Sequence, residues 1–268
     1  MTLSGRIGLV LMSLFLFLAV AGPALAPHDP TRLDLSSTFE APSWSHPMGT
    51  DENGADVLSA VLTGARVGFG ISLLTVFCGL LVGGLLGAIA GTFGGLPDLL
   101  LMRLVDIVFS FPGLLLNLFV LSLVKAPTVG HLIFALAITS WAGFARVARG
   151  QALEIRHREF VVAARALGAS PARILFSHII PNIVPPLVVQ ASFSFAAYLL
   201  VEAGLSFLGL APTLVSWGQL IAQGSRYLLV APHLAIFPGL CLGLCVLGAN
   251  LLGDHVRDAW DQRANPVR

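Results

Sequence analysis

The sequence predicts an all-α, polytopic membrane protein with six transmembrane helices, and three observations carry this prediction. Apolar residues make up 56% of the 268 residues, and charged residues make up only 11%. A water-soluble chain of this size cannot bury so much apolar surface, so lipid must surround most of it. The apolar residues fall into six long runs, and arginines gather in the segments on one side of them. The three cysteines lie inside these runs, where we interpret them as small buried hydrophobic residues rather than zinc ligands or disulfide partners.

The first run follows Arg6, and residues 1–26 form the predicted first transmembrane helix. The run ends in Ala24-Leu25-Ala26, which is also typical of a cleavable signal peptide. Pro27 would then follow the cleavage site, a position that signal peptidase generally does not tolerate. We therefore favour an uncleaved first span.

Residues 27–68 are rich in Pro, Asp and Ser, and we expect an extracytoplasmic loop followed by a short helix that leads into the membrane core. The loop carries acidic side chains at Asp29, Asp34, Glu40, Asp51, Glu52 and Asp56. Such a cluster could hold a metal ion, but carboxylates that only keep a surface solvated are far more common. We therefore predict no metal site in the chain.

The membrane core is predicted over residues 69–253, and its first span covers residues 69–92. One face of this span carries glycines at intervals of four, namely Gly79, Gly83, Gly87 and Gly91. Because lipid provides no hydrophobic drive between helices, such a face favours close van der Waals contact between backbones. The sequence leaves open whether this contact lies inside the subunit or with a second subunit.

The next span should bend at Phe111-Pro112-Gly113, because proline cannot continue a helix without a kink. The spacing of Arg103 and Asp106 predicts an ion pair on one face of this helix. The fourth span is predicted over residues 131–145, with Trp141 as an interface anchor near its cytoplasmic end.

A polar, arginine-bearing segment at residues 146–182 separates the fourth and fifth spans, and we name residues 159–182 the elbow. Helical spacing of apolar residues predicts a first short helix in the elbow. Gly168 then breaks the pattern, and Ser170-Pro171 supplies an N-cap and a first-turn residue for a second helix over residues 172–180. A helix-glycine-helix elbow is typical of a docking surface, although composition alone fits an ordinary basic loop equally well.

The fifth span, at residues 183–203, carries polar side chains at Gln190, Ser194 and Glu202. Polar residues at membrane depth usually face the helix bundle or a water-filled path. We therefore expect these three residues to lie along a translocation path.

Residues 204–232 should cap the outer face, followed by the sixth span at residues 233–253 and a cytoplasmic tail at residues 254–268. Six spans place both termini and the elbow on one side. That side holds eleven arginines, at Arg6, Arg103, Arg146, Arg149, Arg156, Arg158, Arg165, Arg173, Arg257, Arg263 and Arg268. The other side holds four basic residues, at Arg32, Arg66, Lys125 and Arg226. Because basic residues are retained in the cytoplasm, we predict that both termini and the elbow are cytoplasmic.

The sequence of the elbow resembles the EAA loop of ABC-importer permeases. The pattern of that loop is E-A-A, then three residues, Gly, nine residues and I-x-L-P. Ala163-Ala164, Gly168 and Pro181 fall at the intervals of that pattern. Val162 replaces its glutamate and His178 replaces its first isoleucine. The form Y-V-x-A-A-R-x-x-G-A-S, followed by R-H-I-L-P-N, is typical of dipeptide, oligopeptide and nickel permeases. This chain has a similar sequence there, F-V-V-A-A-R-A-L-G-A-S followed by S-H-I-I-P-N.

Other motifs of the same family occur in the right order over about residues 49–261. Gly49-Thr50-Asp51 resembles the start of the family's core, although Ala55 replaces the usual arginine there. The run from Glu202 to Leu210 resembles the motif E-A-x-L-S-F-L-G-L, and the run from Asn250 to Asp258 resembles the tail motif N-L-L-G-D-x-x-R-D.

The resemblance implies the MetI-like transmembrane core of a type I ABC importer in a bacterial inner membrane. It implies a permease subunit that forms half of a translocation path for di- or oligopeptides, next to a second permease subunit in a heterodimer. It further implies two ABC ATPase subunits and an extracytoplasmic substrate-binding protein as partners. In that family residues 146–182 would be the coupling loop, with ATPase contacts at Glu159, Ala163, Ala164, Arg165, Gly168, Ala169, Ser170, Arg173 and Pro181.

Two alternatives stay open at this point. Nickel or another small solute could be the substrate within the same family. A secondary transporter is the alternative from another class, but it would need inverted repeats or paired intramembrane charges, and neither is found.

Several catalytic motifs are missing from the sequence. It contains no G-x-x-x-x-G-K-S/T nucleotide loop, no H-E-x-x-H and no G-x-S-x-G. We therefore expect no catalytic residue and no cofactor in this chain, with ATP and Mg²⁺ bound by the ATPase partners. We expect lipid around the chain and no nucleic-acid partner.

Overall fold

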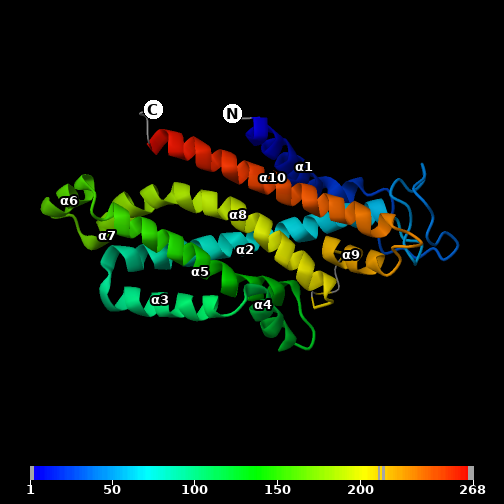
Figure 1. Ribbon diagram of the computed structural model, residues 1–268, viewed down its shortest axis with the longest axis horizontal. Coiled ribbons are helices and arrows are strands. Elements are labelled where there is room, and N and C mark those ends of the chain that lie inside the picture. The colour runs from blue at the N-terminus through cyan, green and yellow to red at the C-terminus, as the bar shows by residue number, and fades with distance from the viewer. Residues whose placement is uncertain (1–2, 211, 213–214, 265–268) are drawn as a thin grey trace.

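The computed structural model describes residues 3–210, 212 and 215–264, and these residues form a bundle of long helices with one extended loop (Figure 1). The elements are α1 (Leu3–Leu25), α2 (Val57–Phe93), α3 (Gly95–Ser110), α4 (Gly113–Ser122), α5 (Val129–Ile155), α6 (Glu159–Ala166), α7 (Pro171–Arg173), the π-helix η1 (Ile174–Ile179), α8 (Ile180–Phe207), α9 (Trp217–Ser225) and α10 (His233–Ala264). The predicted all-α membrane fold is confirmed.

Five helical stretches are long and apolar enough to cross a membrane, namely α1, α2, α5, the run Pro171–Phe207 and α10. Helices α3 and α4 meet the same test only as a pair, and they are bent by 86° at their junction. The predicted bend at Phe111-Pro112-Gly113 is therefore confirmed. Six spans are reached when this bent pair is counted as one broken span.

Helix α2 runs without interruption from Val57 to Phe93, so the separate short helix expected before residue 69 is wrong. Asp56 caps its start, because the carboxylate accepts a hydrogen bond of 2.8 Å from the Ser59 amide. No proline lies between residues 57 and 93, so nothing in the backbone forces a break.

The glycine face of α2 packs against α5 inside this subunit. A Cβ added at Gly79, Gly83, Gly87 or Gly91 would come closer than 3.0 Å to atoms of α5. At Gly83 and Gly87 the nearest of these atoms are the carbonyl oxygens of Trp141 and Ala145. The two backbones therefore approach as closely as the missing side chains allow. The sequence left open whether this glycine face packs inside the subunit or against a second subunit, and the structure shows that it packs inside the subunit.

Helix α5 extends to Ile155, well beyond the predicted end at residue 145. The sequence pattern favoured an earlier end because arginine is costly at membrane depth. In the structure, Arg146 Nη2 lies 3.1 Å from Asp106 Oδ1, and Arg149 Nη2 lies 2.7 Å from Asp98 Oδ2. Carboxylates of α3 thus neutralise both arginines, so the helix can continue.

Two further expectations about this region are wrong. Asp106 pairs with Arg146 across the α3–α5 contact, and not with Arg103 on its own helix. Trp141, expected near the end of its span, lies in the middle of α5 and packs against the cluster of Val105, Ala142 and Ala145. In both cases a neighbouring helix, which the local pattern does not contain, supplies the partner.

The chain from Pro171 to Phe207 is one helical run of 37 residues, and its start is irregular. The second helix of the elbow, expected over residues 172–180, is largely a π-helix at Ile174–Ile179, which precedes Pro181. Pro181 has no amide hydrogen and would clash with a carbonyl one turn earlier, so the wider turn accommodates it. The Asn182 side chain donates a hydrogen bond of 2.7 Å to the His178 carbonyl.

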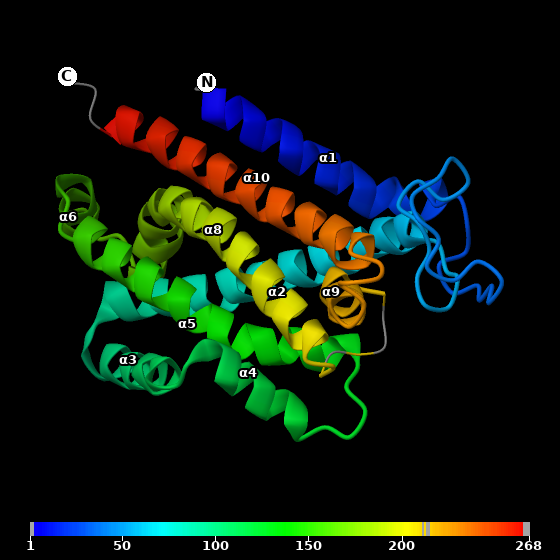
Figure 2. The same cartoon turned by 45° about the vertical axis from the view of Figure 1, so that its right-hand side comes forward.

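Helices α1 and α10 lie side by side on one flank of the bundle, as two views of the structure agree (Figures 1 and 2). Helix α10 continues to Ala264, so the predicted boundary between span and tail at residues 253 and 254 lies inside one helix. The remaining tail residues, 265–268, lie outside the described part of the chain.

We expect Gly83→Ala to destabilise the protein and Gly84→Ala, one residue away, to leave its stability nearly unchanged. A methyl group at Gly83 would meet the Trp141 carbonyl oxygen, whereas at Gly84 the nearest atom is a Leu187 methyl carbon at 3.4 Å. A backbone carbonyl cannot move aside, and overpacking of this kind costs about 1–3 kcal/mol. Thermal unfolding of the two purified variants in detergent measures the difference. Equal midpoints would contradict a close α2–α5 contact.

Candidate functional site

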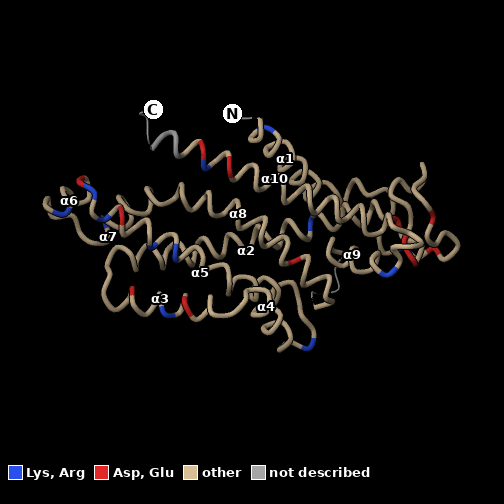
Figure 3. The backbone as a smooth tube through the Cα atoms, viewed as in Figure 1, with Lys and Arg blue, Asp and Glu red and all other residues tan. Residues whose placement is uncertain are grey.

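The elbow projects from one end of the bundle, where α6 and α7 lie beyond the neighbouring helices (Figure 1). It follows α5 directly and leads through η1 into α8. Most charged side chains of this end are basic, whereas the loop before α2 at the opposite end is mainly acidic (Figure 3).

The turn of the elbow has the hydrogen bonds of a Schellman motif. The Gly168 amide donates to the Arg165 carbonyl and the Ala169 amide donates to the Ala164 carbonyl, each at 3.0 Å. Gly168 has φ of +83°, in the left-handed region that glycine adopts without strain. Ser170 then caps the next helix by accepting from the Arg173 amide at 3.3 Å, with Pro171 in its first turn. The predicted helix-glycine-helix geometry is confirmed, with the second helix continuing into α8.

One buried side chain fixes α6 to the rest of the protein. Val161 is fully buried and belongs to the same apolar cluster as Ile155 of α5 and Ile174 and Leu175 of η1. The residue before it in α6, Phe160, has its ring 6.3 Å from the ring of His178 in η1. A force on α6 is therefore transmitted to both α5 and the start of α8.

The opposite face of α6 is open. Leu167 is 87% exposed and Val162 is 51% exposed, which is unusual for apolar residues outside the lipid-facing surface. Among the residues expected to contact the ATPase, seven are exposed, namely Glu159, Ala163, Arg165, Gly168, Ser170, Arg173 and Pro181, and Ala164 and Ala169 are half-buried. The structure thus brings most of the expected contact residues to one accessible end of the chain.

A basic cavity beside the elbow includes residues that sequence reasoning did not select. It measures about 410 Å³ and is lined by Arg156, His157 and Arg165, with Thr92, Phe93, Ala169, Pro171 and Ile174. Arg156 Nη1 donates a hydrogen bond of 3.1 Å to the Gly91 carbonyl near the C-terminal end of α2. The arginine count of the segment was the only signal in the sequence that could have indicated it.

The three residues expected along a translocation path occupy different environments. Gln190 is half-buried, and its amide nitrogen lies 3.3 Å from the Ser194 hydroxyl. Ser194 is 8% exposed and Glu202 only 1% exposed, and the Ser206 hydroxyl donates to Glu202 at 2.8 Å. In this conformation Ser194 and Glu202 face the interior of the chain, and only Gln190 has appreciable accessible surface.

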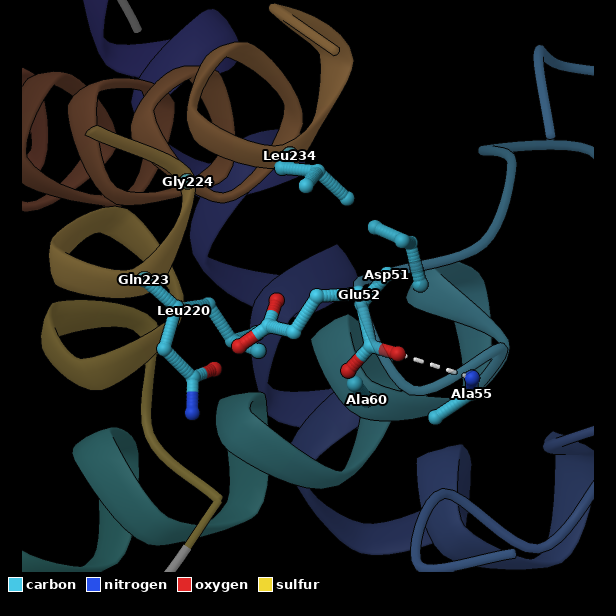
Figure 4. A pocket seen from close by; sticks show the side chains of 9 residues that line it. Asp51, Glu52, Ala55, Ala60, Leu220, Gln223, Gly224 and Leu234 are labelled. Atoms are coloured by element: carbon cyan, nitrogen blue, oxygen red, sulfur yellow. Dashed lines mark hydrogen bonds between the residues drawn. The ribbon is translucent and has the colours of Figure 1, made fainter. Parts of the chain in front are cut away.

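A small cavity also lies at the end of the bundle opposite the elbow, between the loop before α2 and α9 (Figure 4). The Glu52 carboxylate lies near Leu220 and Gln223, and its Oε2 atom is buried without a hydrogen-bond partner. The accessible space of about 10 Å³ matches one water molecule, which would satisfy that oxygen. It is too small for a transported solute.

These features define a class of protein: a multi-pass helical membrane subunit with an exposed, rigidly anchored elbow and no nucleotide-binding motif of its own. The family model described as "Binding-protein-dependent transport system inner membrane component" matches residues 79–266. The chain belongs to this family of ABC-importer permeases. It is thus a multi-pass inner-membrane protein and a transport component.

Curated relatives span nearly the whole chain. The dipeptide transport system permease protein DppC of Alkalihalophilus pseudofirmus is 34% identical over 96% of this chain and 85% of its own length. The probable D,D-dipeptide transport system permease protein DdpC of Escherichia coli K12 is 38% identical, covering 95% and 86%. The glutathione transport system permease protein GsiD of Pectobacterium atrosepticum is 36% identical, covering 95% and 86%.

We expect Gly168→Val to loosen the elbow and Gly168→Asn to preserve it. No atom lies within 4 Å of the Cβ that either residue would add, so the penalty comes from the backbone alone. A β-branched residue in the left-handed region costs about 1–2 kcal/mol, whereas asparagine tolerates this region. Hydrogen exchange of the amides at positions 168 and 169 should be roughly tenfold faster in the valine variant. Unchanged exchange in that variant would show that the left-handed turn is not required.

Proposed function

We propose that this chain is one of two permease subunits of an ATP-driven importer and forms half of its translocation path. The observation that carries the proposal is the anchored, exposed elbow between α5 and α8. A transport subunit without a nucleotide site needs a rigid contact through which an ATPase can move it, and the elbow supplies one. ATP and Mg²⁺ bind to the two ABC ATPase subunits in this proposal, and hydrolysis occurs there.

The elbow couples ATPase motion to the membrane through packing. The exposed small side chains of α6 insert into a cleft of the ATPase, and Arg165 and Arg173 pair with its acidic or backbone groups. Val162 replaces the family's glutamate, and Glu159 offers an exposed carboxylate one turn earlier. Because Val161 shares a buried apolar cluster with residues of α5 and η1, displacement of α6 tilts these two spans together.

The start of α8 is suited to absorb such a displacement. The π-helix at Ile174–Ile179 precedes Pro181, Pro185 and Pro186, which remove three amide donors from the following turns. A π-helical turn next to missing hydrogen bonds is a natural hinge. Alternating access then follows from a bend at this point while the α2–α5 contact stays rigid.

The orientation in the membrane follows from charge. The termini and the elbow are cytoplasmic in this proposal, and the acidic loop before α2 faces the extracytoplasmic substrate-binding protein. The second permease subunit completes a heterodimer. The charge separation between the two ends of the bundle supports this orientation (Figure 3).

The proposed substrates are di- or oligopeptides. The relatives named above carry dipeptide or glutathione transport in their names, which supports a peptide rather than nickel or another small solute. Reconstituted vesicles that contain both permease subunits, the ATPases and the binding protein test the proposal. ATP-dependent uptake of a labelled dipeptide is expected, and uptake driven by an ion gradient alone would favour a secondary transporter.

We expect Ala166→Trp to abolish this ATP-dependent uptake while the protein still folds and inserts. Ala166 is exposed on α6, so the indole meets no atom of this chain but blocks insertion into a partner cleft. The matched control is Ala41→Trp, at an exposed position in the loop before α2. Co-purification of the ATPase and uptake by vesicles are measured for both variants. Normal uptake by Ala166→Trp would contradict docking through α6.

We expect a water-soluble reagent to enter the translocation path and to react first at position 190. Because Gln190 is more accessible than Ser194 and Glu202, a cysteine at position 190 should react with a water-soluble maleimide faster than one at position 194 or 202. Addition of ATP to the assembled importer should change the rate at position 190. If the cysteines at all three positions react only with lipid-soluble reagents, the path lies on another face of α8.

A further inference from the structure

The geometry points to a binding site for a late first-row divalent metal ion, such as Zn²⁺, formed by His28, His46 and Asp56 at the outer end of the protein. The sequence alone predicts no metal site, because its acidic residues fit a solvated surface. The fold brings together one imidazole from just after α1, one from the loop before α2 and the capping carboxylate of α2.

The three donor groups are close enough for one ion to join them. His46 Nδ1 lies 3.0 Å from Asp56 Oδ1, and His28 Nδ1 lies 3.8 Å from Asp56 Oδ2. One ligand atom from each residue lies within 4.8 Å of the other two. A tetrahedral ion with bonds of about 2.0–2.2 Å needs ligand atoms about 3.3 Å apart, so small side-chain rotations suffice.

Helix capping accounts for only part of this arrangement. Ser59 donates its amide and its hydroxyl to Oδ2 of Asp56, at 2.8 and 2.6 Å, and these two bonds complete the cap. Oδ1 faces His46 instead, and the rings of His28 and His46 lie 4.9 Å apart at 33°. Two imidazoles stacked beside a carboxylate exceed what a cap requires.

The surrounding residues hold the donors in place. The His28 amide donates to the Ser59 hydroxyl at 3.1 Å, which fixes this backbone to the first turn of α2. Asp56 is 2% exposed, and the hydrogen bonds from Ser59 fix the orientation of its carboxylate toward the two histidines.

The donor set selects the type of ion. Imidazole nitrogen suits zinc, copper, nickel and iron, whereas magnesium and calcium prefer oxygen ligands. Three protein ligands leave at least one coordination position open. A cavity of about 180 Å³ adjoins the cluster and is also lined by Asp29, Arg32 and Asp34, so water can fill that position.

Binding of the ion would join three segments at this end of the protein. Residues 28, 46 and 56 lie just after α1, in the extended loop and at the start of α2. The ion would therefore restrain the loop that faces the outer aqueous phase in the proposed orientation. The metal is a structural ligand in this inference, separate from the transported solute.

Zinc binding to the purified full-length chain, carrying no histidine tag, tests the inference. After dialysis against Zn²⁺, the wild-type protein should hold one more ion per chain than His28→Ala or His46→Ala, by elemental analysis. Loss of even an outer-shell partner weakens metal binding about 10–100-fold, so loss of a ligand should weaken it at least as much in calorimetric titrations. His131→Ala is the matched control, because His131 caps α5 outside the cluster.

Two more measurements distinguish this site from zinc bound by thiolates and from a loop that has unfolded in the variants. In the wild-type protein, Co²⁺ should give the visible spectrum of nitrogen and oxygen ligands without the thiolate band that Cys241 and Cys245 would produce. His28 is exposed and its ring has no short hydrogen bond to preserve the loop, so tryptic cleavage at Arg32 should be unchanged in metal-free His28→Ala. Equal zinc content in the wild-type protein and both histidine variants would overturn the inference, as would a thiolate spectrum.

Discussion

The close contact between α2 and α5 is the constraint on which the other parts of this protein depend. In lipid there is no hydrophobic drive between helices, so packing must come from van der Waals contact over a long, matched surface. Four glycines on α2 let its backbone approach α5 closely, and three of them, Gly83, Gly87 and Gly91, face carbonyl groups of α5. The resulting pair forms a rigid unit, against which α3 packs on one side and α8 on the other.

The length of α5 links this rigid unit to the elbow. Arg146 and Arg149 would normally end a membrane helix, but Asp106 and Asp98 of α3 neutralise them and the helix reaches Ile155. Ile155 and Val161 of α6 belong to the same buried apolar cluster, so the elbow begins on a fixed support. On its other side the elbow meets a π-helix and three prolines, where the backbone is weakly restrained. Rigidity and flexibility therefore lie on opposite sides of one short helix.

Much of this arrangement could be predicted from the sequence, because its signals are local. Gly168, Ser170 and Pro171 specify a turn and a cap through their own backbone preferences, and the structure contains both. The bend after Ser110 follows from Pro112 in the same way. What could not be predicted depends on distant residues. The pairing of Asp106 with α5, the burial of Glu202 and the meeting of His28 with His46 all need a fold that brings separate segments together.

The two ends of the bundle differ in the kind of surface that they expose. At the elbow end, apolar side chains such as Leu167 are left uncovered, which costs solubility unless a partner covers them. At the opposite end, hydrogen bonds around the Asp56 carboxylate hold the loop before α2, together with the packing of Phe39 and Met48 on the core. A surface that binds a partner can be apolar, because binding removes it from water. A loop that stays in water has to be restrained by polar groups, and this difference explains why the ion-binding donors gather at one end and the exposed small residues at the other.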